Sequence, residues 1–174
     1  MKITNTLCSL VLATAAITFA QAPKKAPASP PAETSVTLGG KSISIKYSAP
    51  SMRGRKIFGG LVPYNEVWRA GANSATALHT DAHITIGSLD VPAGDYTLYV
   101  FLTAESWKLI VNKQTGQWGT EYSESQDLGR VPMTLKKASA PVELYDMKLS
   151  GSGNSGTLAL SWENTVATVP IKVK

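Results

Sequence analysis

The 174-residue sequence contains a single cysteine, Cys8, and only two histidines. Cys8 lies inside an apolar N-terminal run that ends in a small-x-small motif, Ala20-Gln21-Ala22, which is typical of a secretory signal peptide. We expect cleavage near Ala22, and the mature chain would then hold no cysteine. The sequence therefore excludes a disulfide, a thiolate zinc site and a cysteine nucleophile from the predicted mature protein.

Long apolar runs are also missing after this N-terminal segment. A membrane-spanning helix needs about 20 apolar residues, and no later segment provides them. The sequence thus predicts an exported protein, periplasmic or extracellular, with no membrane span in its mature part. The formal net charge of +5 is modest and scattered along the chain, which does not favour nucleic acid as a partner.

A helical repeat is absent as well, because no window of helical length places apolar residues every 3.6 positions. Short alternating runs are separated by glycine and proline, a spacing typical of antiparallel sandwiches and barrels. We predict an all-β fold, a single antiparallel β-sandwich of jelly-roll-like type, over residues 34–174. A signal peptide (1–22) and a linker rich in proline, alanine and lysine (23–33) are expected before it.

Two parts of the predicted sheet are well marked. The alternating runs 36–38 and 43–47 flank Gly39-Gly40, which predicts a hairpin with a two-residue turn. Segment 96–102 is apolar on both faces, so we place it at the centre of the sheet, covered on two sides.

The C-terminal part is interpreted as a series of shorter strands. Segment 151–156 and the tripeptide Glu163-Asn164-Thr165 are predicted to be hairpin turns. Trp107 and Trp162 alternate with polar residues inside strands, so we expect both in the core. The separate strands expected here are 131–135, 142–149, 157–162 and 166–173.

The segment 49–76 follows no regular period and holds three of the four arginines of the chain. Glycine and proline recur in it, between aromatic and aliphatic anchors such as Phe58 and Trp68. Long irregular segments inside compact domains are uncommon and often carry function. We predict a long ordered loop that folds over one end of the sheets.

The arginines of this loop suggest a binding function. A guanidinium group fits carboxylate, sulfate or phosphate and also stacks on aromatic rings. The hypothesis is a binding module for an anionic or polar small molecule, such as an acidic glycan or cell-envelope component. Alternatively, Arg69 braces Trp68 by a cation–π contact and the other cations form a solvated rim. The predicted ligand-binding residues are Arg53, Arg55, Tyr64, Trp68, Arg69, Asn73, Asn112, Lys113, Trp118 and Arg130.

Trp118 has two interpretations. Its segment, 112–119, combines asparagine, lysine and glutamine with this tryptophan, which suits a second wall of a ligand site. Trp118 would then be a stacking platform. Alternatively, it is a plug that folds the loop onto the core.

Metal binding and catalysis have weaker support. His79 and His83, with Asp81 between them, have a four-residue spacing that suits a metal site on a helix, whereas this segment is predicted as strand–turn–strand. The interpretation as two exposed turn residues is therefore favoured over a metal site. A hydrolase or lyase would use His79 or an acid of the 121–127 loop. We favour no catalysis, no metal and no cofactor. The acids of that loop are Glu121, Glu124 and Asp127.

Four runs of the sequence resemble one protein family, in the same order: YSAPSMRGRKIFGGLVPYNEVWRAGANSAT, VPAGDYTLYV, WKLIVNKQTGQWGTEY and GTLALSWENTVATVPI. This family is DUF2911, a domain of unknown function found mainly in exported bacterial proteins. The resemblance implies an exported β-rich domain and little about its chemistry, so a structural interaction domain of the cell envelope remains a third possibility. Ala49 and Ser74 depart from the family pattern, which commonly has an arginine and an acid there.

Overall fold

The computed structural model describes residues 28–174. The predicted signal peptide and the linker up to residue 27 therefore lie outside the described residues. The described chain is an all-β structure with one short 3-10 turn, η1 (Glu124–Gln126), which confirms the predicted fold class. In this part of the chain no helix is long and apolar enough to cross a membrane.

A single antiparallel sheet contains all ten strands. Their bounds are β1 Pro31–Leu38, β2 Lys41–Ser48, β3 Glu66–Trp68, β4 Thr76–Thr80, β5 Ile84–Ile86, β6 Leu89–Val91, β7 Gly94–Leu102, β8 Trp107–Asn112, β9 Asp127–Ser152 and β10 Ser155–Val173. Their order is β1-β2-β4-β7-β8-β9-β10-β5-β6, and β3 also pairs with β7. β7 is thus central, as its two apolar faces predict, and β1 begins before the predicted domain start at residue 34.

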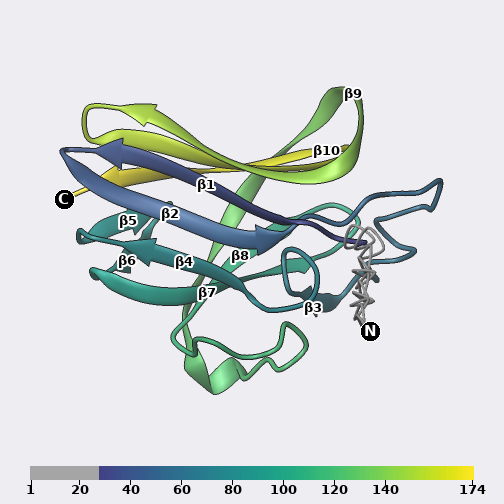
Figure 1. Ribbon diagram of the computed structural model, residues 1–174, viewed down its shortest axis with the longest axis horizontal. Helices are drawn as coiled ribbons and strands as arrows, with labels where there is room; N and C mark the ends of the chain where they lie inside the picture. Colours follow the sequence, from purple (N-terminus) through teal and green to yellow (C-terminus); the bar gives the residue numbers. More distant parts are fainter. Residues whose placement is uncertain (1–27) are drawn as a thin grey trace, which may run out of the picture.

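The sheet folds back on itself, so that the β9–β10 hairpin lies over β1 and β2 (Figure 1). The long strand β9 makes this possible because its first part pairs with β8 and its later part with β10. Side-chain hydroxyls join the layers where β9 passes β1 and β2. The N–H of Met147 donates to the Tyr47 hydroxyl (3.0 Å), and the N–H of Leu149 donates to Thr34 Oγ1 (2.9 Å). The result is a sandwich-like, two-layered fold.

Aromatic rings fill one end of the core. Trp68 stacks on Trp162, with ring centroids 5.7 Å apart and planes at 19°, and Tyr145 meets Trp68 edge-on at 5.1 Å. Phe58 packs against Trp107 at 4.6 Å. Trp107 and Trp162 are 4% and 2% exposed, which confirms their predicted place in the core. Aromatic pairs of this kind add about 0.5–1.5 kcal/mol each beyond area burial, so the cluster ties the loop residues Phe58 and Trp68 to the sheet.

The predicted Gly39-Gly40 hairpin is confirmed. Leu38 pairs with Lys41 across the turn, and the two glycines have φ values of 56° and 75°. Positive φ at both central residues is what a type I′ turn requires, and glycine adopts it without strain.

The prediction of a hairpin turn at Glu163-Asn164-Thr165 is wrong. These residues lie within β10, and the register shifts on both sides of Glu163, whose φ is 52°. Glu163 pairs with Val142 and Thr165 with Lys137, so the extra residues of β9 form a bulge opposite this point. A bulge kinks a strand without ending it. The runs expected as four separate strands are therefore parts of two long ones, β9 and β10.

The segment 49–76 is an ordered loop that also contains β3. A tight turn closes within it, where the N–H of Val62 donates to the carbonyl of buried Ile57 (2.9 Å). The first part of the loop is tied to β9, because the N–H of Met52 donates to the carbonyl of Glu143 (2.8 Å). These contacts hold in place the part of the loop that precedes β3.

Candidate ligand-binding site

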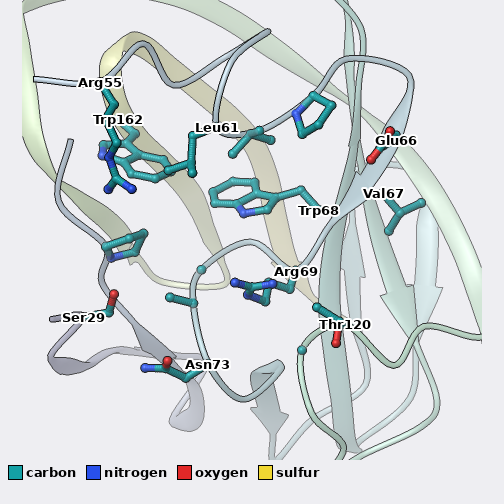
Figure 2. Close-up of a pocket in the computed structure, with 16 residues that line it drawn as sticks. Ser29, Arg55, Leu61, Glu66, Val67, Trp68, Arg69, Asn73, Thr120 and Trp162 are labelled. Carbon is teal, nitrogen blue, oxygen red and sulfur yellow. The ribbon is translucent and has the colours of Figure 1, made fainter. Parts of the chain in front are cut away.

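A hollow of about 450 Å³ opens between the loop 49–76 and the turn after Trp118. We call it the arginine cavity, defined by Arg55, Trp68, Arg69, Asn73 and Gly119 among its lining residues. Figure 2 shows that Arg55 and Arg69 extend into this hollow from different sides, with Trp68 beside them. The structure therefore brings together four of the predicted ligand-binding residues: Arg55, Trp68, Arg69 and Asn73.

Arg55 is exposed, yet its own loop holds it in place. Its Nε donates to the carbonyl of Met52 (2.9 Å) and its Nη2 to the carbonyl of Ser51 (2.7 Å). A guanidinium has five N–H donors, so these two bonds fix the group and leave the other donors for a ligand. Arg53, in contrast, donates to the carbonyl of Ala28 (2.9 Å) and is not part of the cavity lining.

Arg69 lacks such partners. Its Nε is buried and has no hydrogen-bond acceptor, and Arg69 takes part in none of the ion pairs found among residues 28–174. A buried donor without an acceptor costs about 1–3 kcal/mol, and more when the group is charged. An acceptor that enters the cavity would recover part of this free energy.

The backbone that carries Arg69 is held in an unusual conformation. Ala70 has a φ of 49°, in the left-handed region that costs a non-glycine residue about 1–3 kcal/mol. The buried hydroxyl of Thr76 lies 3.1 and 2.9 Å from the carbonyl oxygens of Arg69 and Ala70 and donates to them. The N–H of Ala72 donates to the carbonyl of Ser48 (3.1 Å). β2 and β4 thus fix the strained turn that follows Arg69.

Gly119 makes room for the Arg69 side chain. A Cβ at position 119 would collide with the Arg69 stem and would lie 2.6 Å from the carbonyl oxygen of Asn73. The N–H of Gly119 donates to that same carbonyl (3.1 Å). Gly119 therefore positions Arg69, because only a residue without a side chain fits between the two backbones.

Trp68 contributes one wall of the cavity. It is partly buried, and its stacking on Trp162 covers one face of its ring. Its position is set by packing on other aromatic residues of the core, so it offers a fixed apolar surface to the hollow.

The sequence matches the family described as "Protein of unknown function (DUF2911)" over residues 29–171. The chain belongs to the DUF2911 family. No curated protein and no solved structure is similar enough to match it. The family resemblance is thus confirmed, and the function of this DUF2911 domain has to be argued from its own residues.

Arg130 and Asn112 lie in a separate cluster of the DUF2911 domain. Arg130 donates to Asp127 Oδ2 (2.9 Å), to the Tyr122 hydroxyl (2.8 Å) and to Glu124 Oε1 (2.7 Å). Buried Asn112 donates to Asp127 Oδ1 (2.9 Å). Burial and the hydrogen bond to Asp127 raise the pKa of Tyr122 well above its ordinary value. Glu124 and Asp127 are thus engaged in a closed network, rather than placed as a free catalytic pair.

The other predicted ligand residues also lie outside the arginine cavity. Lys113 is exposed, and its N–H donates to the carbonyl of Gln126 (2.8 Å). Tyr64 is partly buried, with its ring against Gly59. Trp118 is 52% exposed and pairs with Ser74 in an isolated bridge. It therefore does not plug the core, although the residue after it lines the cavity.

His79 lies between two carboxylates. Its Nδ1 is 2.7 Å from Asp95 Oδ1 and its Nε2 is 3.0 Å from Asp81 Oδ1. The hydrogen bond to Asp95, and then that to Asp81, raise the pKa of His79. Each ring nitrogen therefore already has a carboxylate partner, and neither is free to ligate a metal.

The structure therefore brings Asp81 to His79 but does not assemble the suggested metal set. His83 lies apart from this pair, and its carbonyl accepts from the N–H of Lys174 (3.1 Å). Among residues 28–174, no group of three or more His, Cys, Asp and Glu is placed to hold a metal ion. Asp95, the nearer partner of His79, was not predicted, because it comes from the start of a different strand.

Several cavity residues were not predicted either. Glu66 and Thr120 add a carboxylate and a hydroxyl to the lining, while Gly119 and Thr76 position Arg69. No motif marks these residues in the sequence. Their roles follow from contacts between segments that only the folded sheet brings together.

Proposed function

We propose that this protein is a non-catalytic binding module for a small anionic ligand, which it binds in the arginine cavity. The observation that carries the proposal is the buried Arg69 Nε, which has no partner and belongs to a residue lining a hollow of about 450 Å³. Small-molecule sites commonly measure about 300–1,000 Å³, so the hollow has a suitable size.

The lining suggests the type of ligand. Guanidinium forks match carboxylate, sulfate and phosphate through paired N–H···O bonds. Arg55 is already fixed by its loop, so it loses little freedom on binding. Leu61, Val62 and Trp68 are apolar, whereas Asn73 is polar. This mixture favours an anionic group carried on a larger body, such as an acidic sugar, over a bare inorganic ion.

The N-terminal sequence suggests in which compartment the protein would meet this ligand. If the predicted signal peptide directs export, the protein meets glycans and other components of the cell envelope. We therefore extend the proposal to an acidic glycan or an acidic envelope fragment as the class of ligand.

The cavity does not favour the alternative of hydrolysis. Glycoside hydrolysis generally needs two carboxyl groups that flank the scissile bond. Among residues 28–174, Glu66 is the one residue with a carboxylate that lines the cavity. His79 lies on β4 with both ring nitrogens bonded to carboxylates. The available chemistry is recognition of charge rather than proton transfer.

A titration of the purified protein tests the proposal. Glucuronate, a galacturonate trimer, phosphate and sulfate would be titrated by calorimetry into the wild type, Arg69→Met and Arg53→Met. Arg69→Met keeps most of the stem but removes the charge, and Arg53→Met is the matched control outside the cavity. We expect an acidic sugar to bind the wild type and the control, with affinity at least about tenfold weaker for Arg69→Met.

Thermal unfolding provides the second readout. A ligand at about 100 times its dissociation constant adds about 2.7 kcal/mol to stability, and that increase should disappear in Arg69→Met. Equal binding by the wild type and a folded Arg69→Met variant would contradict the proposal, as would no binding of any of the four probes. If Arg69→Met instead unfolds at markedly lower temperature, Arg69 is a brace of the loop.

A further inference from the structure

The outer face of the sheet carries a second hollow. Lys46 of β2 pairs with Ala77 of β4, and Ala77 pairs with Thr97 of β7; these strands lie side by side in Figure 1. Ala77 is exposed and short, so it leaves a low floor between longer side chains. We call this hollow the sheet groove.

The sheet groove consists of two adjoining hollows of about 460 and 340 Å³. Lys46 and Ala77 line both of them. His79 and Asp95 line the larger one. The turn at 115–117 contributes Thr115 to the larger hollow and Gly116 and Gln117 to the smaller. None of these residues lines the arginine cavity, so the two places are distinct.

Gln117, which lines the smaller hollow, has a side-chain oxygen that accepts no hydrogen bond. It is 8% exposed, and its Nε2 donates to Thr97 Oγ1 (3.3 Å) and to the Tyr99 hydroxyl (3.0 Å). Thr97 in turn donates to the carbonyl of Gln114 (2.7 Å), and Tyr99 to that of Glu121 (3.0 Å). Each hydroxyl has one proton and already donates it to a carbonyl, so both hydroxyls can only accept a hydrogen bond from the Gln117 amide. This fixes the orientation of the amide and leaves Oε1 buried without a partner.

The charges along the groove cancel one another. Lys46 is a cation, and the His79 ring is paired with Asp81 and Asp95. Hydroxyl groups that can both donate and accept complete the lining, from Ser44 and Thr115 in the larger hollow and Ser74 in the smaller. A ligand that suits this face is neutral and has many hydroxyl groups, unlike the anion proposed for the arginine cavity.

We propose that the sheet groove binds a neutral oligosaccharide, which lies across β2 and β4 and donates a hydroxyl proton to Gln117 Oε1. Sugar hydroxyls, like those of serine and threonine, donate and accept together, so they match a lining of mixed polarity. Because Oε1 is buried, the proposal includes an outward shift of the turn at 115–117 that lets the sugar reach it.

The test is calorimetric titration of the purified protein with cellotetraose, maltotetraose and chitotetraose. Ala77→Trp fills the floor of the groove from an exposed position, so the fold should tolerate it. Thr37→Trp adds the same ring at an exposed position of β1 outside the groove. At least one sugar should bind the wild type and Thr37→Trp, with affinity at least about tenfold weaker for Ala77→Trp. Gln117→Leu should weaken it too, and circular dichroism would check that each variant is folded.

The outcomes separate this site from the arginine cavity. Sugar binding should persist in Arg69→Met, because Arg69 lies outside the sheet groove. The proposal is overturned if none of the three sugars binds, if Ala77→Trp binds as tightly as the wild type, or if Arg69→Met loses sugar binding. A negative result with acidic ligands leaves this experiment unaffected, since it depends on different residues.

Discussion

Arg69 and Arg130 use the same side chain in opposite ways. Arg130 donates to Asp127, Glu124 and a tyrosine hydroxyl at 2.7–2.9 Å. Arg69 has no ion-pair partner among residues 28–174, and its Nε lacks an acceptor. Arg130 closes the loop between β8 and β9, whereas Arg69 lies in a cavity. A guanidinium that is paired with carboxylates of its own loop stabilises the fold, while one without such partners can bind a ligand.

The loops that carry these residues differ in the same way. The loop between β8 and β9 is held by neutral side chains too, because Asn112 bridges the carbonyl of Ser123 and Asp127, each at 2.9 Å. The turn that follows Arg69 is held by backbone contacts and by the hydroxyl of Thr76. The Arg69 side chain is therefore left available for a ligand, at the cost of strain at Ala70.

The largest expected effect on stability is that of Arg130→Met. The Asp127 side chain is 11% exposed, so the variant would leave a mostly buried carboxylate without its counter-charge. Breaking a buried ion pair costs about 3–5 kcal/mol, and because Arg130 is itself 29% exposed we expect about 2–3 kcal/mol. Urea unfolding at neutral pH measures this loss. Binding of acidic sugars should stay unchanged.

Arg69→Met is the matched variant in that experiment. It removes a guanidinium that has no ion-pair partner among residues 28–174 and whose buried Nε costs about 1–3 kcal/mol, so stability should stay unchanged or rise by up to about that amount. If Arg69→Met lost as much stability as Arg130→Met, the contrast between the two arginines would be refuted.

A smaller loss is expected for Gly119→Ala. The added methyl group would collide with the Arg69 stem and would lie 2.6 Å from the Asn73 carbonyl oxygen, and forced repacking of this kind costs about 1–3 kcal/mol. Arg69 should move into the cavity, so acidic sugars should bind more weakly as well. Unfolding and titration of the same sample would show both effects.

Thr120→Ala is the control for Gly119→Ala, because it changes the next residue without adding an atom. It should leave the stability within about 0.5 kcal/mol of wild type. A Gly119→Ala variant that is as stable as this control and binds as tightly as wild type would show that Gly119 does not position Arg69.

The part of the fold that local sequence determines was predictable. Gly39-Gly40 can form a two-residue turn on its own, and the apolar faces of segment 96–102 require cover on both sides. The continuity of β9 and β10 was not predictable in this way. Glu163-Asn164-Thr165 has the composition of a turn, and only the opposing bulge in β9 allows the strand to continue.

The candidate site shows the same division. The clustering of arginine and tryptophan in segment 49–76 pointed to Arg55, Trp68 and Arg69, which the cavity brings together. Sequence could not show that Arg130 pairs with Asp127 and Glu124, because these carboxylates come close to it only when the loop folds back. It also could not show the role of Gly119, which depends on a close approach between two backbones.

The smallest expected effect is the pH dependence of stability that arises from His79. Hydrogen bonds to Asp95 and Asp81 raise its folded-state pKa above the ordinary 6.5. A raised pKa means that the folded state binds the proton more tightly. The stabilisation of the folded state by protonated His79 is therefore complete below about pH 6.5 and is lost as the pH rises through the folded-state pKa. The His79 side chain is 47% exposed, so solvent screening should keep the effect below about 0.5 kcal/mol.

Urea unfolding of the wild type and His79→Gln between about pH 5 and pH 9 measures this contribution. The wild type should be the more stable protein at the acidic end, and the difference should shrink as the pH rises. Asp81 sets a lower limit to the window, because the hydrogen bond from His79 lowers its pKa from 3.8 and the pair weakens once this carboxyl is protonated. His83→Gln changes the other histidine, which lies outside the pair, and controls for the loss of a ring. A difference that stays constant across the range would mean that His79 contributes through packing rather than through its charge.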